Sequence, residues 1–116
     1  MNKIVRGAIF YADLGDTIGS EEKGIRPVLI VQNDIGNRFS PTTIIAPIST
    51  QKTDKLPNHV LIKQFDKIRP NSIVLLEQIR VIDKSRLKGF VTTLNEEQIV
   101  EVNTALIHTL DIKFKK

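Results

Sequence analysis

The hydrophobic pattern in the first half of the chain predicts short β-strands joined by turns. Residues 7–13 (GAIFYAD) are rich in aromatic and β-branched side chains, and residues 26–32 (RPVLIVQ) are apolar on both faces, as in a strand covered on two sides. Residues 42–49 (TTIIAPIS) predict a third strand. Between these segments, residues 14–25 carry three glycines and predict a long flexible loop, and residues 33–41 carry Asn, Gly and Pro and predict a turn.

The second half of the chain continues with strands and then changes period. Residues 58–63, 72–83 and 89–94 predict further strands, and the second of these is long enough to cross a small barrel and pass its rim. The last segment is different, because apolar side chains recur at helical spacing from Ile99 to Leu110. These elements predict a helix that ends the fold.

Asn95 marks the start of this helix. With Gln98 three positions later, it resembles a capping box, in which each side chain bonds a backbone N–H of the first turn. Five or six short strands with one terminal helix predict a mainly β fold: a small, strongly bent antiparallel sheet that forms an SH3-like barrel, with the helix packed on it.

Composition narrows the class of protein without naming a function. A chain of 116 residues, 41% hydrophobic and 26% charged, is expected to fold as one domain over residues 1–116. Seventeen Lys and Arg against thirteen Asp and Glu give a net charge of +4, which favours a polyanionic partner. The absence of cysteine and of any segment resembling a signal peptide or membrane span predicts a cytoplasmic protein without disulfides.

Motifs of familiar enzymes are missing. The sequence has no phosphate-binding glycine loop, no HExxH and no GxSxG. Its two histidines, His59 and His108, do not suggest an acid-base pair, since His108 falls on the polar side of the helix and His59 begins a strand, where a structural or surface role is expected. With no cysteine, no clustered histidines and no carboxylates at metal-ligand spacing, no metal and no cofactor are predicted.

Polar residues at strand ends are more informative. Pro27 restricts Arg26 to extended conformations, so a guanidinium with five donors stands on a stiff backbone and would suit a phosphate. Ser49 and Thr50 end the third strand and point to opposite faces, which leaves either one as the functional hydroxyl.

The segment EQIR (77–80) belongs to the same group of polar strand ends. It predicts that Gln78 and Arg80 share one face of a strand and that Glu77 lies on the other.

Four segments, taken together and in this order, resemble the MazF/PemK family of toxin endoribonucleases, most closely the MazF branch of Gram-positive bacteria. They are residues 19–21 (GSE), 26–37 (RPVLIVQNDIGN), 49–51 (hydroxyl-x-Gln) and 75–80 (LLEQIR). The resemblance implies a homodimer that cuts single-stranded RNA at short sequences as the toxin of a type II toxin-antitoxin system. It also implies a cognate antitoxin, whose acidic, disordered tail would fold onto a basic groove near Arg26 and displace the loop at 14–25.

The resemblance also implies roles for single residues. Arg26 matches the catalytic arginine, and Ser49 stands at the position of the catalytic threonine, where the loss of the methyl group frees the hydroxyl's rotamer. Three positions match residues associated with RNA contact: Glu21, Gln51 and Gln78. Their neighbours complete the candidate substrate-binding set: Gly19, Ser20 and Arg80.

Cleavage by the RNA's own 2′-hydroxyl requires in-line geometry and charge stabilisation at the phosphate, but no protein nucleophile and no metal. Arg26 and Ser49 would supply these. The general base stays open between Glu21 and His59. Tyr11 and Phe39 are the aromatic residues that could stack on bases, but both are expected in the core. Two other functions remain possible for such a barrel: a toxin that acts by binding a protein target such as gyrase, and a nonspecific RNA-binding module.

Overall fold

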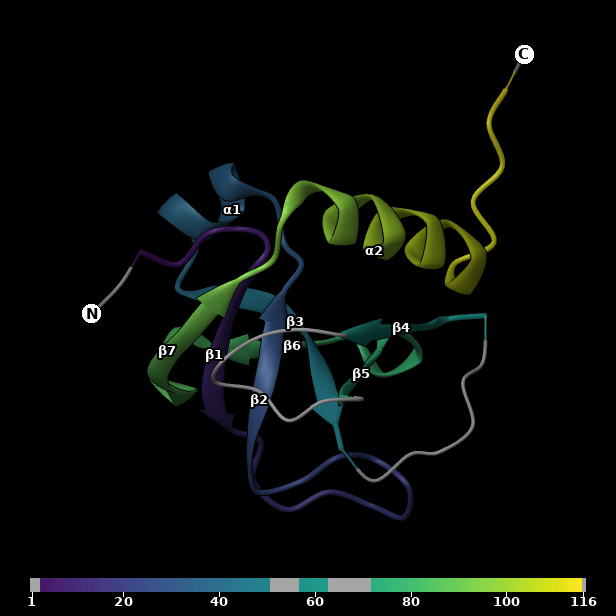
Figure 1. The fold of residues 1–116 in the computed structure, drawn as a ribbon. Helices are drawn as coiled ribbons and strands as arrows, with labels where there is room; N and C mark the ends of the chain where they lie inside the picture. Colours follow the sequence, from purple (N-terminus) through teal and green to yellow (C-terminus); the bar gives the residue numbers. More distant parts are fainter. Residues whose placement is uncertain (1–2, 51–56, 63–71, 116) are drawn as a thin grey trace.

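The computed structural model describes residues 3–50, 57–62 and 72–115. Within these ranges seven strands form one antiparallel sheet in the order β4-β5-β3-β2-β1-β7, with β6 paired to β3 (Figure 1). The strands are β1 (Ala8–Asp13), β2 (Ile25–Ile30), β3 (Thr42–Ser49), β4 (His59–Ile62), β5 (Ser72–Leu75), β6 (Arg80–Asp83) and β7 (Leu87–Thr93). The helices are α1 (Asp34–Phe39), α2 (Glu96–Thr109) and the short 3-10 turns η1 (Leu76–Gln78) and η2 (Lys84–Arg86). The predicted mainly β fold with a C-terminal helix is confirmed.

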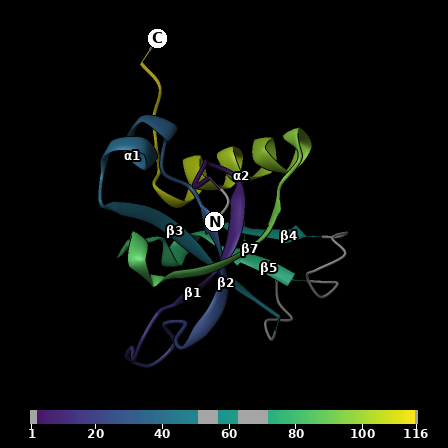
Figure 2. The ribbon, with the colours of Figure 1, turned by 90° about the vertical axis from the view of Figure 1, so that its left-hand side faces the viewer.

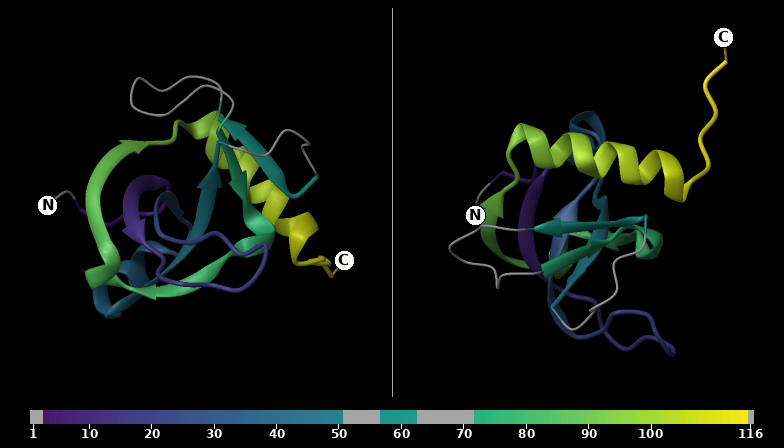
Figure 3. Two further views of the ribbon diagram at one scale, coloured as in Figure 1. Left: turned by 90° about the horizontal axis from the view of Figure 1, so that it is seen from below. Right: turned by 45° about the vertical axis from the view of Figure 1, so that its right-hand side comes forward.

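The sheet curves around one hydrophobic cluster and carries α2 over another (Figure 3). In β2, Val28 and Ile30 belong to the inner cluster, while Leu29 between them belongs to the cluster beneath α2. This alternation follows from the two-residue period of a strand. It explains why residues 26–32 read as apolar on both faces, and the prediction of a strand covered on two sides is confirmed.

Helix α2 begins where the sequence predicted. The side chain of Asn95 accepts a hydrogen bond from the backbone N–H of Gln98 at 2.9 Å, which satisfies one of the free donors of the first turn. The return half of the capping box is not formed, because Oε1 of Gln98 is buried without a hydrogen-bond partner in the described chain. None of the helices in the described ranges is long and apolar enough to cross a membrane.

The predicted strand 72–83 is interrupted. Ile48 of β3 pairs with Val74 of β5, and Ile45 of β3 pairs with Arg80 of β6. The two positions in β3 are three residues apart, whereas their partners are six residues apart. The three additional residues form η1, which stands out from the edge of β3 as an enlarged bulge. The prediction of one continuous strand was therefore wrong, because the extra residues become visible only once both strand pairings are known.

The predicted turn at 33–41 contains the short helix α1 instead. The side chain of Asn33 caps it by accepting a hydrogen bond from the N–H of Gly36 at 2.8 Å. Asn37 is buried on its inner side and accepts a hydrogen bond from the Thr43 hydroxyl at 2.7 Å. Asparagine favours turns in isolation, but here two asparagine side chains bond in ways that support a helix.

The loop between β1 and β2 extends from the end of the barrel opposite α1 and α2, as two perpendicular views show (Figures 1 and 2). Its base is closed by paired backbone bonds, from the N–H of Leu14 to the carbonyl of Gly24 and from the N–H of Gly24 to the carbonyl of Gly15. This end of the molecule carries the start of β2 and with it Arg26.

Candidate functional site

Arg26 lies at the second position of β2, half-buried, opposite Ala12 of β1. Its Nε donates a hydrogen bond to the carbonyl oxygen of Lys23 at 3.1 Å. In the described part of the chain no carboxylate lies within 4.0 Å of the guanidinium, and its two terminal nitrogens make no hydrogen bond there. The side chain is therefore held at one nitrogen and presents the other two.

Ser49 is brought to Arg26 by strand register. The β2–β3 ladder pairs Ile30 with Ile45 and Val28 with Pro47. This ladder ends at Val28 and Pro47, two residues short of Arg26 and Ser49 on their strands, so the strand period directs these two side chains to the face that Val28 and Pro47 share. At this point β3 turns to pair with β5, where Ser49 lies opposite Ile73.

The two hydroxyls at the end of β3 differ in burial. Ser49 is 2% exposed, whereas the following residue, Thr50, is exposed. This difference in burial is consistent with the expectation that the two side chains point to opposite faces of the strand. The burial of Ser49 gives its hydroxyl a defined surrounding, and the strand register puts it near the arginine.

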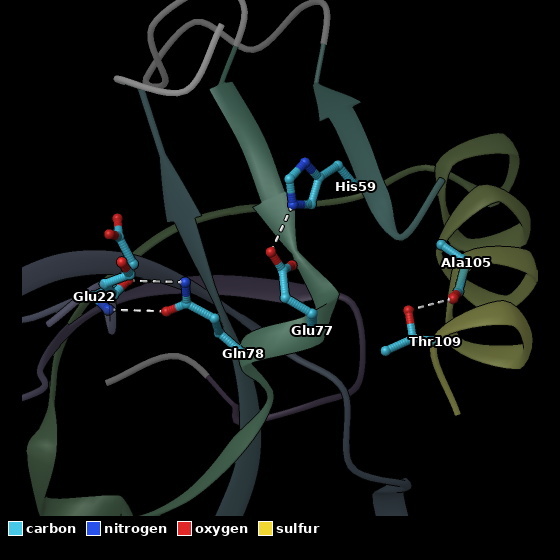
Figure 4. Close-up of polar contacts among 7 residues, drawn as sticks. Glu22, His59, Glu77, Gln78, Ala105 and Thr109 are labelled. Carbon is cyan, nitrogen blue, oxygen red and sulfur yellow. Dashed lines mark hydrogen bonds and ion pairs between the residues drawn. The ribbon is translucent and has the colours of Figure 1, made fainter. Parts of the chain in front are cut away.

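Gln78 meets the β1–β2 loop directly. Its Oε1 accepts a hydrogen bond from the backbone N–H of Glu22 at 2.9 Å, and its Nε2 donates to the carbonyl oxygen of Ser20 at 3.2 Å (Figure 4). A further bond inside the loop joins the Thr17 hydroxyl to the carbonyl of Glu21 at 2.9 Å. The segment predicted as a flexible loop is thus tied by hydrogen bonds to itself and to η1.

Arg80 supports the base of the same loop. Its Nη1 donates to the carbonyl oxygen of Leu14 at 3.3 Å, and Nη1 of Arg86 donates to the carbonyl of Asp13 at 3.1 Å. Gly19, with φ +59°, occupies the left-handed region that favours glycine, and lies at the exposed tip beside Ser20. The structure therefore brings Gly19, Ser20, Gln78 and Arg80 together around this loop.

A shallow cavity of about 660 Å³ lies beside Arg26. Its charged lining is mixed, since Asp13 and Asp16 face it together with Lys23 and Arg26. This cavity is therefore not basic overall, and the basic groove expected near Arg26 stays a prediction. The carboxylates come from the end of β1 and the loop after it, which strand pairing places beside the start of β2.

His59 and Glu77 form a hydrogen-bonded pair on the other side of η1. The Nε2 atom of His59 lies 2.7 Å from Oε2 of Glu77 (Figure 4). The His59 side chain is only 3% exposed and that of Glu77 is 33% exposed. Glu77 and Gln78 therefore point to different partners, as the sequence predicted, although they lie in a 3-10 turn and not in a strand.

Other predicted residues fall into three groups. Gln51 lies outside the described residues. Glu21 is exposed on the loop. Tyr11 and Phe39 were expected in the core, but they are 44% and 76% exposed, which overturns that expectation.

The two aromatic side chains are exposed for different reasons. Tyr11 shares a face with Ile9 but lies beyond the cluster that α2 covers. Phe39 ends α1 and stacks against the guanidinium of Arg38, 5.4 Å from the ring centre.

Sequence reasoning missed the backbone groups of the site. The side chains of Gln78 and Arg26 bond to the N–H of Glu22 and to the carbonyls of Ser20 and Lys23, and no residue type predicts such contacts. Within the described ranges, no three His, Cys, Asp or Glu side chains are close enough to hold a metal ion.

Comparison with known proteins agrees with this arrangement. Residues 5–110 match the family described as PemK-like, MazF-like toxin of type II toxin-antitoxin system. Endoribonuclease EndoA from Bacillus subtilis (strain 168) is 51% identical over 106 residues, which cover 89% of this chain and 90% of that relative.

Solved structures share the fold. An endoribonuclease in complex with its cognate antitoxin from a mycobacterial species aligns with a TM-score of 0.81 at 23% identity, over 97% of this chain and 99% of that one. MazF from Deinococcus radiodurans aligns with a TM-score of 0.81 at 18% identity, over 97% and 100%. With the family match over residues 5–110 and a relative 51% identical across most of its length, this chain belongs to the PemK-like, MazF-like toxins of type II toxin-antitoxin systems.

Proposed function

We propose that this chain, as a single toxin domain over residues 1–116, is a sequence-specific, metal-independent endoribonuclease that cleaves single-stranded RNA, including mRNA in the cytoplasm. The name of its 51% identical relative, an endoribonuclease, supports this activity. The observation that carries the proposal is the state of Arg26, whose Nε is anchored to Lys23 while its terminal nitrogens are open, next to the strand position of Ser49.

The reaction needs few groups from the protein. The 2′-oxygen of the nucleotide before the cut attacks phosphorus, the bond from phosphorus to the 5′-oxygen breaks, and a proton moves from the 2′-hydroxyl to a base while the 5′-oxygen gains one. Arg26 binds the nonbridging oxygens and stabilises the charge that grows there in the transition state. Ser49 donates a hydrogen bond to a nonbridging oxygen or orients the attacking hydroxyl.

The general base is chosen from two candidates. The Nε2 atom of His59 is bonded to Glu77, on the side of η1 away from the β1–β2 loop, so His59 is poorly placed to take a proton from RNA bound near that loop (Figure 4). A guanidinium keeps its proton at neutral pH, which makes Arg26 a poor base as well. Glu21, exposed on the loop above η1, is therefore the side chain to which we assign this role.

Partners follow from the family. The active unit is a homodimer, and a cognate antitoxin blocks the RNA site; one of the related folds was solved in complex with its cognate antitoxin. The acidic tail of such a partner would meet Arg26 and Lys23 and compete with the loop around Glu21. Because Asp13 and Asp16 also line the cavity, the acidic side chains of the tail must contact Arg26 and Lys23 and avoid these two carboxylates.

The test uses pure protein and a long single-stranded RNA in EDTA. Discrete fragments are expected, with a free 5′-hydroxyl and a 2′,3′-cyclic phosphate or 3′-phosphate at the ends. Replacing the ribose before the cut by deoxyribose should abolish cleavage and leave binding largely intact, since phosphate contacts do not use that hydroxyl. Products with a 5′-phosphate, or cleavage of the deoxy oligonucleotide, would show an activated water instead, and binding without fragments would indicate a non-catalytic module.

A further inference from the structure

Three consecutive residues of η1 have three different anchoring functions. Leu76 is fully buried in the cluster beneath α2, and its N–H donates to the carbonyl of Asn58 at 3.3 Å. Glu77 is paired with His59 in β4. Gln78 binds the β1–β2 loop, so η1 links that loop to the side of the barrel that α2 covers (Figure 4).

The contacts of Gln78 enclose one position of the loop. Its amide accepts from the N–H of Glu22 and donates to the carbonyl of Ser20, the residues directly after and directly before Glu21. A primary amide carries an acceptor and a donor side by side, and therefore binds a backbone segment much as a neighbouring strand would. The backbone of Glu21 is held on both sides, while its side chain is exposed.

We propose that Gln78 is a positioning residue, which fixes the backbone at Glu21 so that this side chain is presented to RNA, and that the His59–Glu77 pair holds η1 in place for this purpose. The inference rests on the proposed function for its effect on RNA, but the contact itself exists in the free protein. It differs from direct base contact by Gln78, because the same amide groups are engaged with the loop.

The physical basis is preorganisation. The loop is long and carries glycines with positive φ at positions 15, 19 and 24, so without contacts it would sample many conformations. Ordering it before RNA arrives removes part of the entropic cost of binding. Two hydrogen bonds at one amide achieve this only if η1 itself does not move, and the pairing of Glu77 with a buried histidine restrains it.

The contact can be measured without RNA. In Gln78→Ala, hydrogen exchange at the Glu22 N–H should rise at least about tenfold, because the acceptor of that N–H is lost. Gln98→Ala is the matched control: Gln98 lies in α2, and its Oε1 has no partner in the described chain, so Glu22 exchange should stay unchanged. Unchanged exchange in Gln78→Ala would overturn the proposal, whether or not the protein cleaves RNA.

The role of the His59–Glu77 pair is tested in the same way. Glu77→Ala removes a side chain that is one-third exposed, and should raise Glu22 exchange several-fold through the loosened η1. Because truncating the buried His59 could impair folding, His59→Gln serves as the second variant and should raise exchange less. If both variants fold and leave the Glu22 N–H protected, the pair has no part in positioning.

A double-mutant cycle separates positioning from base reading. In the Arg26→Ala background, in which an all-ribose oligonucleotide is expected to stay largely uncut, Gln78→Ala and Glu21→Ala should each weaken binding by roughly 5- to 10-fold, the scale of one hydrogen bond. If Gln78 acts through Glu21, then Gln78→Ala should weaken binding less than about twofold in the Glu21→Ala background. Additive losses would mean that Gln78 contacts RNA independently, which would overturn the assignment.

Discussion

Arg26 shows how a strand end can prepare a cation for a phosphate. Pro27 keeps the backbone extended, pairing with Ala12 fixes its direction, and the carbonyl of Lys23 holds Nε. In the described chain no carboxylate lies within 4.0 Å of the guanidinium, so its terminal nitrogens need not break an ion pair to bind substrate. The cost of reorganising the side chain on binding is correspondingly small.

Arg26→Ala should therefore lower the cleavage rate by at least about 10², the scale for losing one preorganised charge donor, while the fold persists. Single-turnover cleavage of a defined oligonucleotide measures the rate, and circular dichroism checks the fold. Arg38→Ala is the matched control, because Arg38 lies on α1 at the opposite end of the barrel. A folded Arg26→Ala protein with near-normal cleavage would remove this arginine from the mechanism.

The hydroxyls at the end of β3 make a second residue-scale prediction. Ser49 is buried and in register with Arg26, and Thr50 is exposed, so Ser49→Ala should reduce the cleavage rate more than Thr50→Ala does. The two rates, measured side by side on one substrate, decide the question. The reverse order would assign the catalytic hydroxyl to Thr50.

At the scale of elements, the seat of α2 depends on one glycine. Gly7 has φ +93°, and a Cβ added there would lie 2.8 Å from Cδ1 of Ile99 in α2. The positive φ is what requires glycine, because the atom that a Cβ would meet is the terminal carbon of the Ile99 side chain. Its N–H and carbonyl bond to Ile30 and Leu94, so the residue joins β2 to the segment that leads into α2.

Gly7→Ala should accordingly lower the free energy of unfolding by about 1–3 kcal/mol, from backbone strain and a shift of the Ile99 side chain. Urea unfolding followed by circular dichroism measures this. Gly89→Ala in β7 is the control, because a Cβ there meets no atom within 4 Å, and its effect should be well below 1 kcal/mol. Equal losses in the two variants would show that the approach of Ile99 is not limiting.

At the scale of the whole molecule, exposed apolar side chains lie on α1. Ile35 and Phe39 are each 76% exposed and border a cavity of about 680 Å³ that Ile4 and Val5 also line. Large exposed apolar patches are typical of interaction surfaces. The proposed homodimer would give such side chains a partner.

Sedimentation of the free protein should give the mass of a dimer at working concentration. The reason is that a shared RNA groove, as the family implies, requires two chains. Dilution should lower the specific activity once the dimer dissociates. Fully active protein that sediments as a monomer would contradict the shared-groove proposal.

Local patterns determined most of the elements. The runs of apolar, aromatic and β-branched residues in β1, β2 and β3 and the helical period after Asn95 are properties of neighbouring residues, and the structure confirms the strands and α2 that they predicted. The polar strand ends also pointed to Arg26, Gln78 and either Ser49 or Thr50 before their surroundings were known. In each case the signal lies within a few positions of the residue itself.

Tertiary structure decided how those residues meet. The break at η1 exists because β3 pairs with β5 and β6 in registers that differ by three residues, and nothing within 72–83 reveals that difference. The burial of His59, the exposure of Tyr11 and Phe39, and the two backbone bonds of Gln78 likewise depend on which distant segments lie alongside. Residue types specify what a side chain can bind, but the pairing of strands far apart in the sequence determines what it reaches.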